Sequence, residues 1–318
     1  MPATSTADPA LTVVMVSYNT RDLTLAALRT LLETTRETAM RVVVLDNAST
    51  DGSAEAVAAS FPEVELVRSC ENLGFARANN RVAAAARTEW LLLLNPDTEC
   101  RPGAVDRLMA FARARPEAGI WGGRTVFPDG RLNPSSCWMR ITPWSMLCRA
   151  TGLTALFPDS SLFNPEGLGG WARDSTREVD IVSGCFLLIR RALWEELGGF
   201  DLRYFMYGED ADLCLRAARA GWRPAITPEA EIVHLVGAAS TRADKLVMVN
   251  AARVTLMRDH WPGALVPLGV GLHWLWGAVR LGWARVRALT GRPGDLETAR
   301  KWRAVWARRR DWLTGYAP

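Results

Sequence analysis

The first part of the chain, up to about residue 128, alternates between continuous apolar runs and segments with apolar residues every three or four positions. The apolar runs, rich in Val, Ile and Leu, predict strands at 11–18, 41–47, 64–69, 89–97 and 119–127. The segments between them predict helices at 22–35, 53–61, 74–86 and 103–116, with Asp22 placed to cap the first. This alternation predicts a parallel, doubly wound sheet that is covered on both faces.

The alternation stops between about 129 and 178, where Pro, Gly, Ser and Trp are frequent and no period is visible. A loop of this length inside a compact domain is more often functional than idle. Periodic segments return as a strand at 179–191, a short helix at 192–200, a loop and helix at 206–222, a strand at 230–235 and a helix at 245–261. We expect them to complete the same α/β domain.

The end of the chain is basic and rich in Trp. Ten Lys or Arg stand against three Asp or Glu between Arg280 and Pro318, whereas the whole chain has a net charge of only +4. The mildly acidic remainder argues against a nucleic-acid-binding core, and the tail is expected to have its own partner. Residues 264–280 are apolar and too short for a membrane span, a pattern that favours a helix in a membrane interface. A helix packed on the rest of the chain, or an oligomer contact, is the alternative.

Several classes of protein are excluded by composition. The 318 residues suffice for a large core, and the six cysteines are too far apart for a zinc site with paired ligands. No apolar run reaches the roughly 18–20 residues of a spanning helix, which excludes a polytopic membrane protein. Residues 1–10 have neither the basic nor the apolar region of a secretory signal, so we expect a disordered N-terminus and a cytoplasmic protein.

Polar residues follow four of the predicted strands, and they lie at 17–19, 46–52, 71–75 and 95–97. Because ligands bind beyond the carboxyl ends of parallel strands, these loops are expected to meet on one rim and bind a nucleotide. Neither a G-x-G-x-x-G after the first strand nor a P-loop pattern occurs, which disfavours dinucleotide and P-loop sites. Helix capping by Asp46, Asn47, Ser49 or Asp51, and plain turns at Asn72 and Gly74, are the alternatives.

These loops also carry a resemblance to a known family. It rests, in order along the chain, on SYN, VLDNASTDGS, ENLGFARANN, LLLLNPDT, GCFLLIRRALWEELGGFD and YFMYGEDADLCLRAARAGW. The chain resembles family-two inverting glycosyltransferases of the GT-A fold, most closely the rhamnosyltransferase-like branch, from about residue 11 to 240. The resemblance implies an α/β fold with a doubly wound, mostly parallel sheet. Residues 11–128 would bind the nucleotide sugar, 129–262 would form the acceptor-binding and catalytic half, and 263–318 a basic amphipathic helical tail.

The resemblance assigns roles to individual residues. The nucleotide-sugar donor would be bound by Ser17, Tyr18, Asn19, Asp46, Asn72, Gly74, Arg77, Asn79, Asn95 and Asp97. Asp97 and His234 would hold Mg²⁺ or Mn²⁺, and Asp210 would be the general base, with Glu209 orienting the acceptor. One departure is Asn95, which stands at the first position of the family's D-x-D motif and leaves one carboxylate there.

Other side chains are open to two interpretations. Gly184, Cys185 and Trp171 would face the acceptor, as would Trp138 and Trp144, although core packing explains the cysteine and tryptophans nearly as well. His234 could be an interior histidine with satisfied hydrogen bonds. Asp210 could cap a helix, with Glu209 and Asp212 in solvent, and for Asp212 we favour that reading. His260 and His273 receive no role.

The chemistry requires these residue types. A cation offsets charge on the departing diphosphate, and a carboxylate on the opposite face deprotonates the acceptor, so that single displacement inverts the anomeric centre. We expect transfer of L-rhamnose from dTDP-L-rhamnose, or of a sugar from a UDP-sugar, to a cell-envelope glycan or polyprenyl-linked acceptor. The tail would bind the cytoplasmic face of the plasma membrane. The alternatives are a sugar nucleotidyltransferase, which needs a glycine-rich basic loop unlike SYNTRD, and a non-catalytic sugar-nucleotide-binding protein.

Overall fold

The computed structural model describes residues 9–235 and 243–317, so the expected disorder of residues 1–10 falls mostly outside the described residues. The chain divides into two compact units. The first comprises Met1–Trp138, Ala172–Phe205 and Glu209–Ala238, and the second comprises Met139–Trp171, Met206–Gly208 and Ala239–Pro318. The predicted functional division at residues 128 and 262 stays a prediction.

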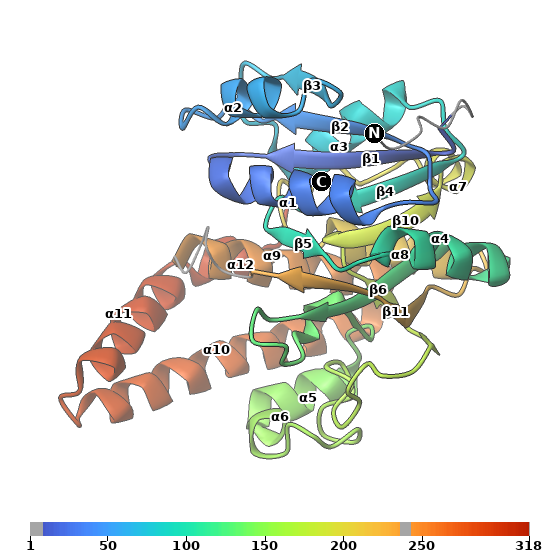
Figure 1. The fold of residues 1–318 in the computed structure, drawn as a ribbon. Coiled ribbons are helices and arrows are strands. Elements are labelled where there is room, and N and C mark those ends of the chain that lie inside the picture. The colour runs from blue at the N-terminus through green and yellow to red at the C-terminus, as the bar shows by residue number, and fades with distance from the viewer. Residues whose placement is uncertain (1–8, 236–242, 318) are drawn as a thin grey trace. The chain divides into compact units, whose positions relative to one another are not determined.

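A nine-stranded mixed sheet forms the centre of the first unit (Figure 1). Its main path has the order β3-β2-β1-β4-β10-β6-β11-β5, and β8 pairs with β11. The strands are β1 (Leu11–Ser17), β2 (Met40–Asp46), β3 (Glu65–Arg68), β4 (Trp90–Leu94), β5 (Thr98–Cys100), β6 (Ile120–Val126), β8 (Arg177–Glu178), β10 (Phe186–Arg190) and β11 (Ala225–His234). The first four are parallel, as predicted.

The order of the strands brings the second half of the chain against the first. β10 runs antiparallel to both β4 and β6, and β5 is antiparallel to β11. The predicted strand at 179–191 is in fact two, because the chain turns at Ser183–Cys185 between β9 (Ile181–Val182) and β10. β9 pairs instead with β7 (Cys137–Trp138). This turn therefore opens next to the carboxyl end of β4.

Helices cover both faces of the sheet (Figure 1). They are α1 (Arg21–Thr34), α2 (Ser53–Ser60), α3 (Gly74–Ala85), α4 (Ala104–Ala114), α7 (Arg191–Glu196) and α8 (Glu209–Arg219). Leu11, Val13 and Met15 alternate along β1 and join one buried cluster with residues of α1 and α4. Such clusters of apolar side chains hold the strand ends in place. The predicted Asp22 cap is wrong, because α1 begins one residue earlier and Thr20 is the N-cap.

The second unit is helical. It contains α5 (Pro143–Thr151), α6 (Leu153–Leu156), α9 (Ala243–His260), α10 (Val266–Ala288), α11 (Pro293–Ala307) and α12 (Arg309–Leu313). The expectation of an irregular stretch at 129–178 missed α5. This helix starts with a capping box between Thr142 and Ser145 and ends at Gly152, whose φ is 85°. Caps rather than apolar periodicity define it, because it is only nine residues long.

Helix α10 is longer than the sequence led us to expect. The helical segment Gly263–Ala288 has 26 residues and is, by length and composition, the one described helix apolar enough to cross a membrane. One face is packed within the unit: Trp276 and Gly277 are buried, and the Trp276 ring meets Trp302 of α11 at 5.3 Å. Trp274 and Trp283 are exposed. The alternative of a helix packed on the rest of the chain therefore holds for one face of α10. Membrane binding stays a prediction for the other face.

Candidate active site

The loops that follow β1 and β2 are tied together. The side-chain oxygen of Asn19, a residue with φ of 52°, accepts a hydrogen bond from the Thr50 N–H at 2.8 Å. The Asn19 N–H donates to Ser49 Oγ at 3.0 Å, and the Arg21 N–H donates to Asp51. The two strand ends thus form one rigid rim, beside which the Tyr18 side chain is left exposed.

Asp46 presents an unused acceptor at the end of β2. The residue is 5% exposed, and its Oδ2 accepts a hydrogen bond from the Ser49 N–H at 3.1 Å. Its Oδ1 is buried and has no partner among the described residues. Leaving a buried acceptor unsatisfied costs about 1–3 kcal/mol, so this oxygen is suited to a ligand that brings a donor. Ser17 lies opposite Asp46 in the sheet and hydrogen-bonds to Thr24.

Asn47 organises the loop after β3. Its amide donates to Asn72 Oδ1 at 3.0 Å and to the Gly74 carbonyl at 3.2 Å, and its oxygen accepts from the Leu73 N–H. Asn47 lies in the loop at 46–52 that is expected to bind the nucleotide, with helix capping as the alternative, and neither reading predicts these contacts to the loop after β3. Gly74 has φ of 74°, and a Cβ there would lie 2.5 Å from the Phe205 carbonyl oxygen. Only glycine fits this close approach.

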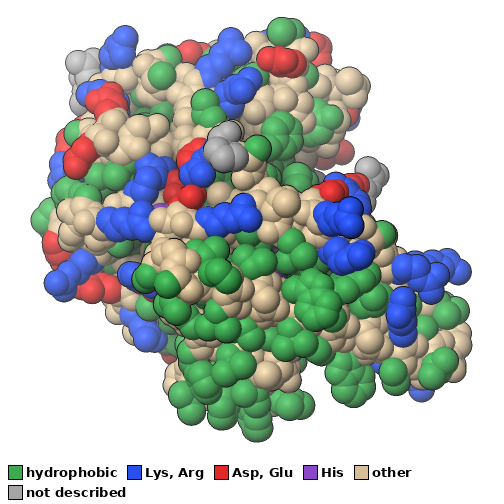
Figure 2. Space-filling model, turned by 180° about the vertical axis from the view of Figure 1, so that it is seen from behind, with side chains coloured by type: hydrophobic (Ala, Val, Ile, Leu, Met, Phe, Trp, Pro, Cys, Tyr) green, Lys and Arg blue, Asp and Glu red, His purple; other side chains and the backbone are tan. Residues whose placement is uncertain are grey.

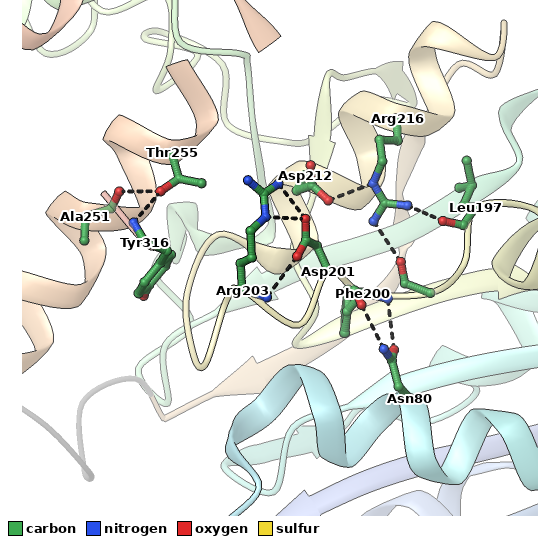
Figure 3. Close-up of polar contacts among 11 residues, drawn as sticks. Asn80, Leu197, Phe200, Asp201, Arg203, Asp212, Arg216, Ala251, Thr255 and Tyr316 are labelled. Carbon is green, nitrogen blue, oxygen red and sulfur yellow. Dashed lines mark hydrogen bonds and ion pairs between the residues drawn. The ribbon is translucent and has the colours of Figure 1, made fainter. Parts of the chain in front are cut away.

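Helix α3 carries three polar side chains with different surroundings. Arg77 is exposed, whereas Asn79 is buried and donates to the Phe75 carbonyl at 2.9 Å. Asn80, which the sequence analysis passed over, exchanges hydrogen bonds with both the N–H and the carbonyl of Phe200 (Figure 3). The amide of Asn79 is thus used inside the protein, and the donor-binding roles of Arg77 and Asn79 stay predictions.

Asp97 and His234 form the expected pair. Because His234 lies opposite Thr98 in the β5–β11 ladder, its Nε2 comes 3.3 Å from Asp97 Oδ1. Its Nδ1 lies 3.1 Å from the hydroxyl of Ser135, a residue of the irregular stretch that no sequence signal marked. Burial lowers the pKa of His234, but the neighbouring Cys185 and Asp97 outweigh it and raise that pKa to about 10. His234 therefore favours its protonated form beside Asp97.

The turn before β10 connects this pair with the predicted base. The Asn95 N–H donates to the Cys185 carbonyl at 3.1 Å, and the Gly184 N–H donates to Asp210 Oδ2 at 3.0 Å. Cys185 also contacts His234. The Gly184–Cys185 dipeptide thus has the expected metal-binding pair on one side and Asp210 on the other. The sequence analysis placed both glycine and cysteine facing the acceptor, and that role stays a prediction.

The acids at the start of α8 differ in their surroundings. Burial raises the pKa of Asp210, although backbone N–H groups of Gly184 and Ala211 oppose this by bonding the carboxylate. Glu209 is 5% exposed, and burial followed by repulsion from Asp210 raises its pKa well above the usual range. Its Oε2 is buried and has no partner among the described residues. Burial thus favours the protonated form of both acids, and repulsion from Asp210 adds to this effect at Glu209.

Asp212 is not in solvent, and the expectation that it would be is wrong. It is 2% exposed, and its carboxylate pairs with Arg216 Nε at 2.7 Å. Arg216 also donates to the carbonyls of Leu197 and Gly199 (Figure 3). Asp212 is buried because this pair ties α8 to the segment that follows α7. Its role is structural.

The tryptophans of the irregular stretch do not share one environment. Trp138 lies in β7 of the first unit, whereas Trp144 and Trp171 belong to the second. Trp144 is 42% exposed, and its Nε1 donates to the Leu162 carbonyl at 2.7 Å. The acceptor-side role of Trp171 stays a prediction.

Comparison with known proteins identifies the family. Residues 12–197 match the family described as Glycosyl transferase family 2. The chain belongs to this family. This glycosyltransferase is 35% identical over 216 residues to N-acetylglucosaminyl-diphospho-decaprenol L-rhamnosyltransferase of Mycobacterium tuberculosis, a match that covers 62% of this chain and 67% of the relative. It is 29% identical to the O-antigen biosynthesis protein RfbC of Myxococcus xanthus, over 75% of this chain and 18% of that one.

Solved structures confirm the fold of the glycosyltransferase. A mannosyltransferase of Pyrobaculum calidifontis, in complex with GDP-Man and Mn²⁺, superposes with a TM-score of 0.58 at 20% identity, covering 96% of this chain and 88% of the other. S. aureus TarS 1–349 with UDP-GlcNAc gives 0.52 at 15% identity, covering 95% and 81%. The expected GT-A fold and the expected class of enzyme, a nucleotide-sugar-dependent glycosyltransferase, are therefore confirmed.

Proposed function

We propose that the enzyme transfers L-rhamnose from dTDP-L-rhamnose, with inversion, to a hydroxyl of a polyprenyl-linked cell-envelope glycan. The single observation that carries the mechanism is the Gly184–Cys185 dipeptide, which contacts Asp210 through the Gly184 N–H and the His234 of the Asp97–His234 pair through the Cys185 side chain. The choice of sugar and acceptor is supported by the relative that is 35% identical and named a decaprenol-linked rhamnosyltransferase. A UDP-sugar is the second candidate donor.

Asp46 would recognise the base of the donor. Its buried, unpartnered Oδ1 needs a hydrogen-bond donor, and thymine and uracil both offer an imide N–H whereas cytosine offers an acceptor at that ring position. Burying an acceptor against an acceptor is costly, so the site would reject cytidine nucleotides. The rim formed by Asn19, Ser49 and Thr50 would hold the nucleoside beside Tyr18.

The Asp97–His234 pair would hold the divalent cation that the family implies. One carboxylate oxygen and one imidazole nitrogen suit Mn²⁺ or Mg²⁺ when oxygens of the donor diphosphate and water complete the shell. Among the described residues, no three or more His, Cys, Asp and Glu side chains are arranged so that they could hold a metal ion together, so the protein would supply few ligands. Asn95 would add an uncharged amide. When bound, the cation offsets the charge on the leaving diphosphate.

Asp210 would take the proton from the acceptor hydroxyl. The Gly184 and Ala211 N–H groups fix both of its oxygens, and the raised pKa brings the carboxylate closer to the pH at which it accepts a proton efficiently. Glu209, favoured in its protonated form, would donate a hydrogen bond that orients the acceptor. Deprotonated and hydrogen-bonded in this way, Asp210 is suited to a single displacement with inversion.

A panel of sugar nucleotides, incubated with the enzyme, Mn²⁺ and a polyprenyl-linked glycan acceptor, tests this function. We expect release of dTDP from dTDP-L-rhamnose, with slower or no release from UDP-, GDP- and CDP-sugars, measured by chromatography of the nucleotides. Pyrophosphate release from a sugar phosphate and a nucleoside triphosphate would indicate a nucleotidyltransferase instead. Absence of any nucleoside diphosphate with every donor and acceptor would favour a non-catalytic binding protein.

The affinity of Asp46→Asn for dTDP, measured by calorimetry, tests base recognition. The amide keeps an oxygen for the Ser49 N–H but removes the second acceptor, so we expect dTDP to bind about tenfold more weakly. Asp51→Asn is the matched control, because that carboxylate bonds backbone groups of the same two loops. Equal loss in both variants would mean that loop geometry, rather than base contact, sets affinity.

We also propose that the exposed face of α10 binds the cytoplasmic surface of the membrane. Figure 2 shows hydrophobic side chains gathered over the region of α5, α6 and α10, and exposed large members include Leu268, Trp274, Trp283 and Leu289. We expect flotation with vesicles containing anionic phospholipid, weaker with neutral vesicles, and lost in Trp283→Ser with Leu289→Ser. Binding that these substitutions leave unchanged would refute the proposal, and a shift to monomer on light scattering would favour an oligomer contact.

A further inference from the structure

A second cluster of charged side chains lies within the second unit and is used by none of the roles above. It gathers residues of α5, α9, α10 and the segment after α6. Its members are Arg149, Glu166, Arg253, His273, Trp276 and Arg280. Helix α5 packs against α10, which brings the two helices' members together.

The cluster has more positive than negative charge. Arg253 and Glu166 form a bidentate ion pair with distances of 2.5 and 2.7 Å. The Arg149 guanidinium instead lies 4.4 Å from the centre of the Trp276 ring, and that of Arg280 lies 5.9 Å from it. The charged groups that act on Arg149 are Arg253, Glu166 and Arg280. One carboxylate thus faces three guanidinium groups, of which that of Arg280 belongs to an exposed residue. Glu166 is already paired with Arg253, so the largely buried Arg149 is left without a carboxylate of its own, and keeping such a cation from water costs free energy unless an anion joins it.

Hydrogen-bond donors in the same place lack acceptors. Arg149 Nε, Arg253 Nε, Asn250 Nδ2 and Trp276 Nε1 are all buried, and none has a partner among the described residues. Folded proteins have only a few unsatisfied buried groups per hundred residues, so four within one cluster require an explanation. The ring nitrogens of His273, which are also buried without a side-chain partner, supply one acceptor at most when the imidazole is neutral. The four donors therefore outnumber the acceptors, which points to a missing ligand that carries several acceptor oxygens.

The pKa of His273, the histidine of the cluster, is changed by the same arginine charges. His273 is fully buried and stacks on Trp276 at 5.4 Å. Burial, together with Arg253 and Arg149, holds the pKa of His273 well below its usual range, and the Asn250 backbone carbonyl only partly opposes this. The neutral form of His273 is therefore favoured, so the positive charge of the site comes from the arginines, and this charge favours binding of an anion.

We propose that this cluster binds the diphosphate group of a lipid-linked acceptor substrate. Arginine forks match phosphate oxygens in geometry and charge, and a diphosphate offers enough acceptors for the four idle donors. Arg149 is partly exposed, although its Nε is buried. The lipid is indicated by exposed apolar side chains on the same two helices, Trp144 and Leu147 on α5 and Trp274 and Leu275 on α10. The proposal rests on the proposed function for the identity of the acceptor as lipid-linked.

Binding of farnesyl diphosphate, a short isoprenyl diphosphate, tests the site. Calorimetry in EDTA with saturating dTDP keeps the probe from the nucleotide site, and we expect Arg149→Met to bind it at least about tenfold more weakly than the unaltered enzyme. Arg285→Met is the matched control, since Arg285 is exposed on α10 and lies outside the cluster. Equal affinity in the unaltered enzyme and Arg149→Met would overturn the proposal.

Thermal unfolding separates a binding role from a structural one. Arg149→Met removes a cation that has no carboxylate of its own, so we expect the ligand-free Tm to stay the same or rise, while farnesyl diphosphate no longer raises it. If Arg149 only supported the fold through Trp276, the Tm would fall and the ligand response would remain. If Arg149→Met fails to fold, Arg149→Lys takes its place, because it keeps the positive charge but loses the paired N–H donors of the guanidinium. We expect it to bind farnesyl diphosphate more weakly than the unaltered enzyme does, but not to lose binding.

Two further measurements identify the ligand and the source of any failure. Inorganic pyrophosphate that binds as tightly as farnesyl diphosphate, with the same loss in Arg149→Met, would overturn the lipid assignment.

In transfer assays with a diphosphate-linked acceptor, we expect Arg149→Met to raise KM about tenfold and leave kcat and dTDP affinity unchanged. Transfer with unchanged KM contradicts this inference alone. Absence of rhamnosyl transfer together with Arg149-dependent lipid diphosphate binding contradicts the proposed function alone.

Discussion

Replacing Asp210 with Asn is expected to lower kcat by about 10²–10⁴ while dTDP affinity changes little, because a positioned general base contributes a factor of this size. The amide oxygen can still accept the hydrogen bond from Gly184, so the backbone of the turn is preserved. Steady-state kinetics and dTDP calorimetry on the same preparation measure the two effects. A variant that turns over within a few-fold of the unaltered enzyme would mean that another group takes the proton.

The pH profile gives an independent check on this base. Burial raises the pKa of Asp210 above its ordinary value of 3.8, so its carboxylate takes up a proton at higher pH than an exposed aspartate would. We therefore expect kcat/KM to fall as the pH drops through that raised value, and Asp210→Asn to lack this acidic limb. Glu209→Gln is the matched control. Because the raised pKa of Glu209 favours its neutral form, a neutral amide in its place should retain most of the turnover.

Asp97→Ala is expected to reduce Mn²⁺-dependent binding of dTDP-L-rhamnose by about 10²-fold or more. Asp97 is the carboxylate of a site in which Asn95 brings no charge, and the loss leaves His234 without the partner 3.3 Å from its Nε2. Calorimetric titration with donor at several Mn²⁺ concentrations measures the effect. Metal-independent binding of dTDP should be nearly unchanged.

Asn95→Asp provides the reciprocal variant. It places a second carboxylate beside the first, so we expect Mn²⁺ to bind more tightly, with half-saturation at lower concentration. Glu99→Gln, on β5 between Thr98 and Cys100, controls for a general change of charge near the site. An identical Mn²⁺ titration for Asp97→Ala and the unaltered enzyme would remove Asp97 from the metal site.

The parallel half of the fold could be predicted because its signals are local. β1, β2 and β4 each contain a continuous apolar run, whereas β3 has only Leu66 and Val67 between two charged residues. The helices between these strands have their own apolar period, so these elements can be recognised without distant contacts. The short helix α5 was missed because a capping box, rather than a period, defines it. β9 and β10 were merged because the turn at Ser183–Cys185 is set by pairing with β7 and β4.

Local rules also failed for the acids of α8. From the sequence, Asp210 and Asp212 look alike, since both stand in the first turn of a helix. Arg216 buries Asp212 in an ion pair four residues along the helix, whereas the Gly184 N–H, 26 positions away in the chain, holds Asp210. The environment of each carboxylate is therefore decided by what packs against it.

The sequence by itself determined the family, the parallel strands and the residue types needed for sugar transfer, because apolar periodicity and short motifs are properties of neighbouring residues. Only the tertiary structure decided which polar atoms are left without partners. Asp46 Oδ1 and the arginine donors around Trp276 are isolated by residues distant in the chain. Burial and long-range pairing set the cost of an unmet hydrogen bond or charge, and neither can be read from the order of amino acids.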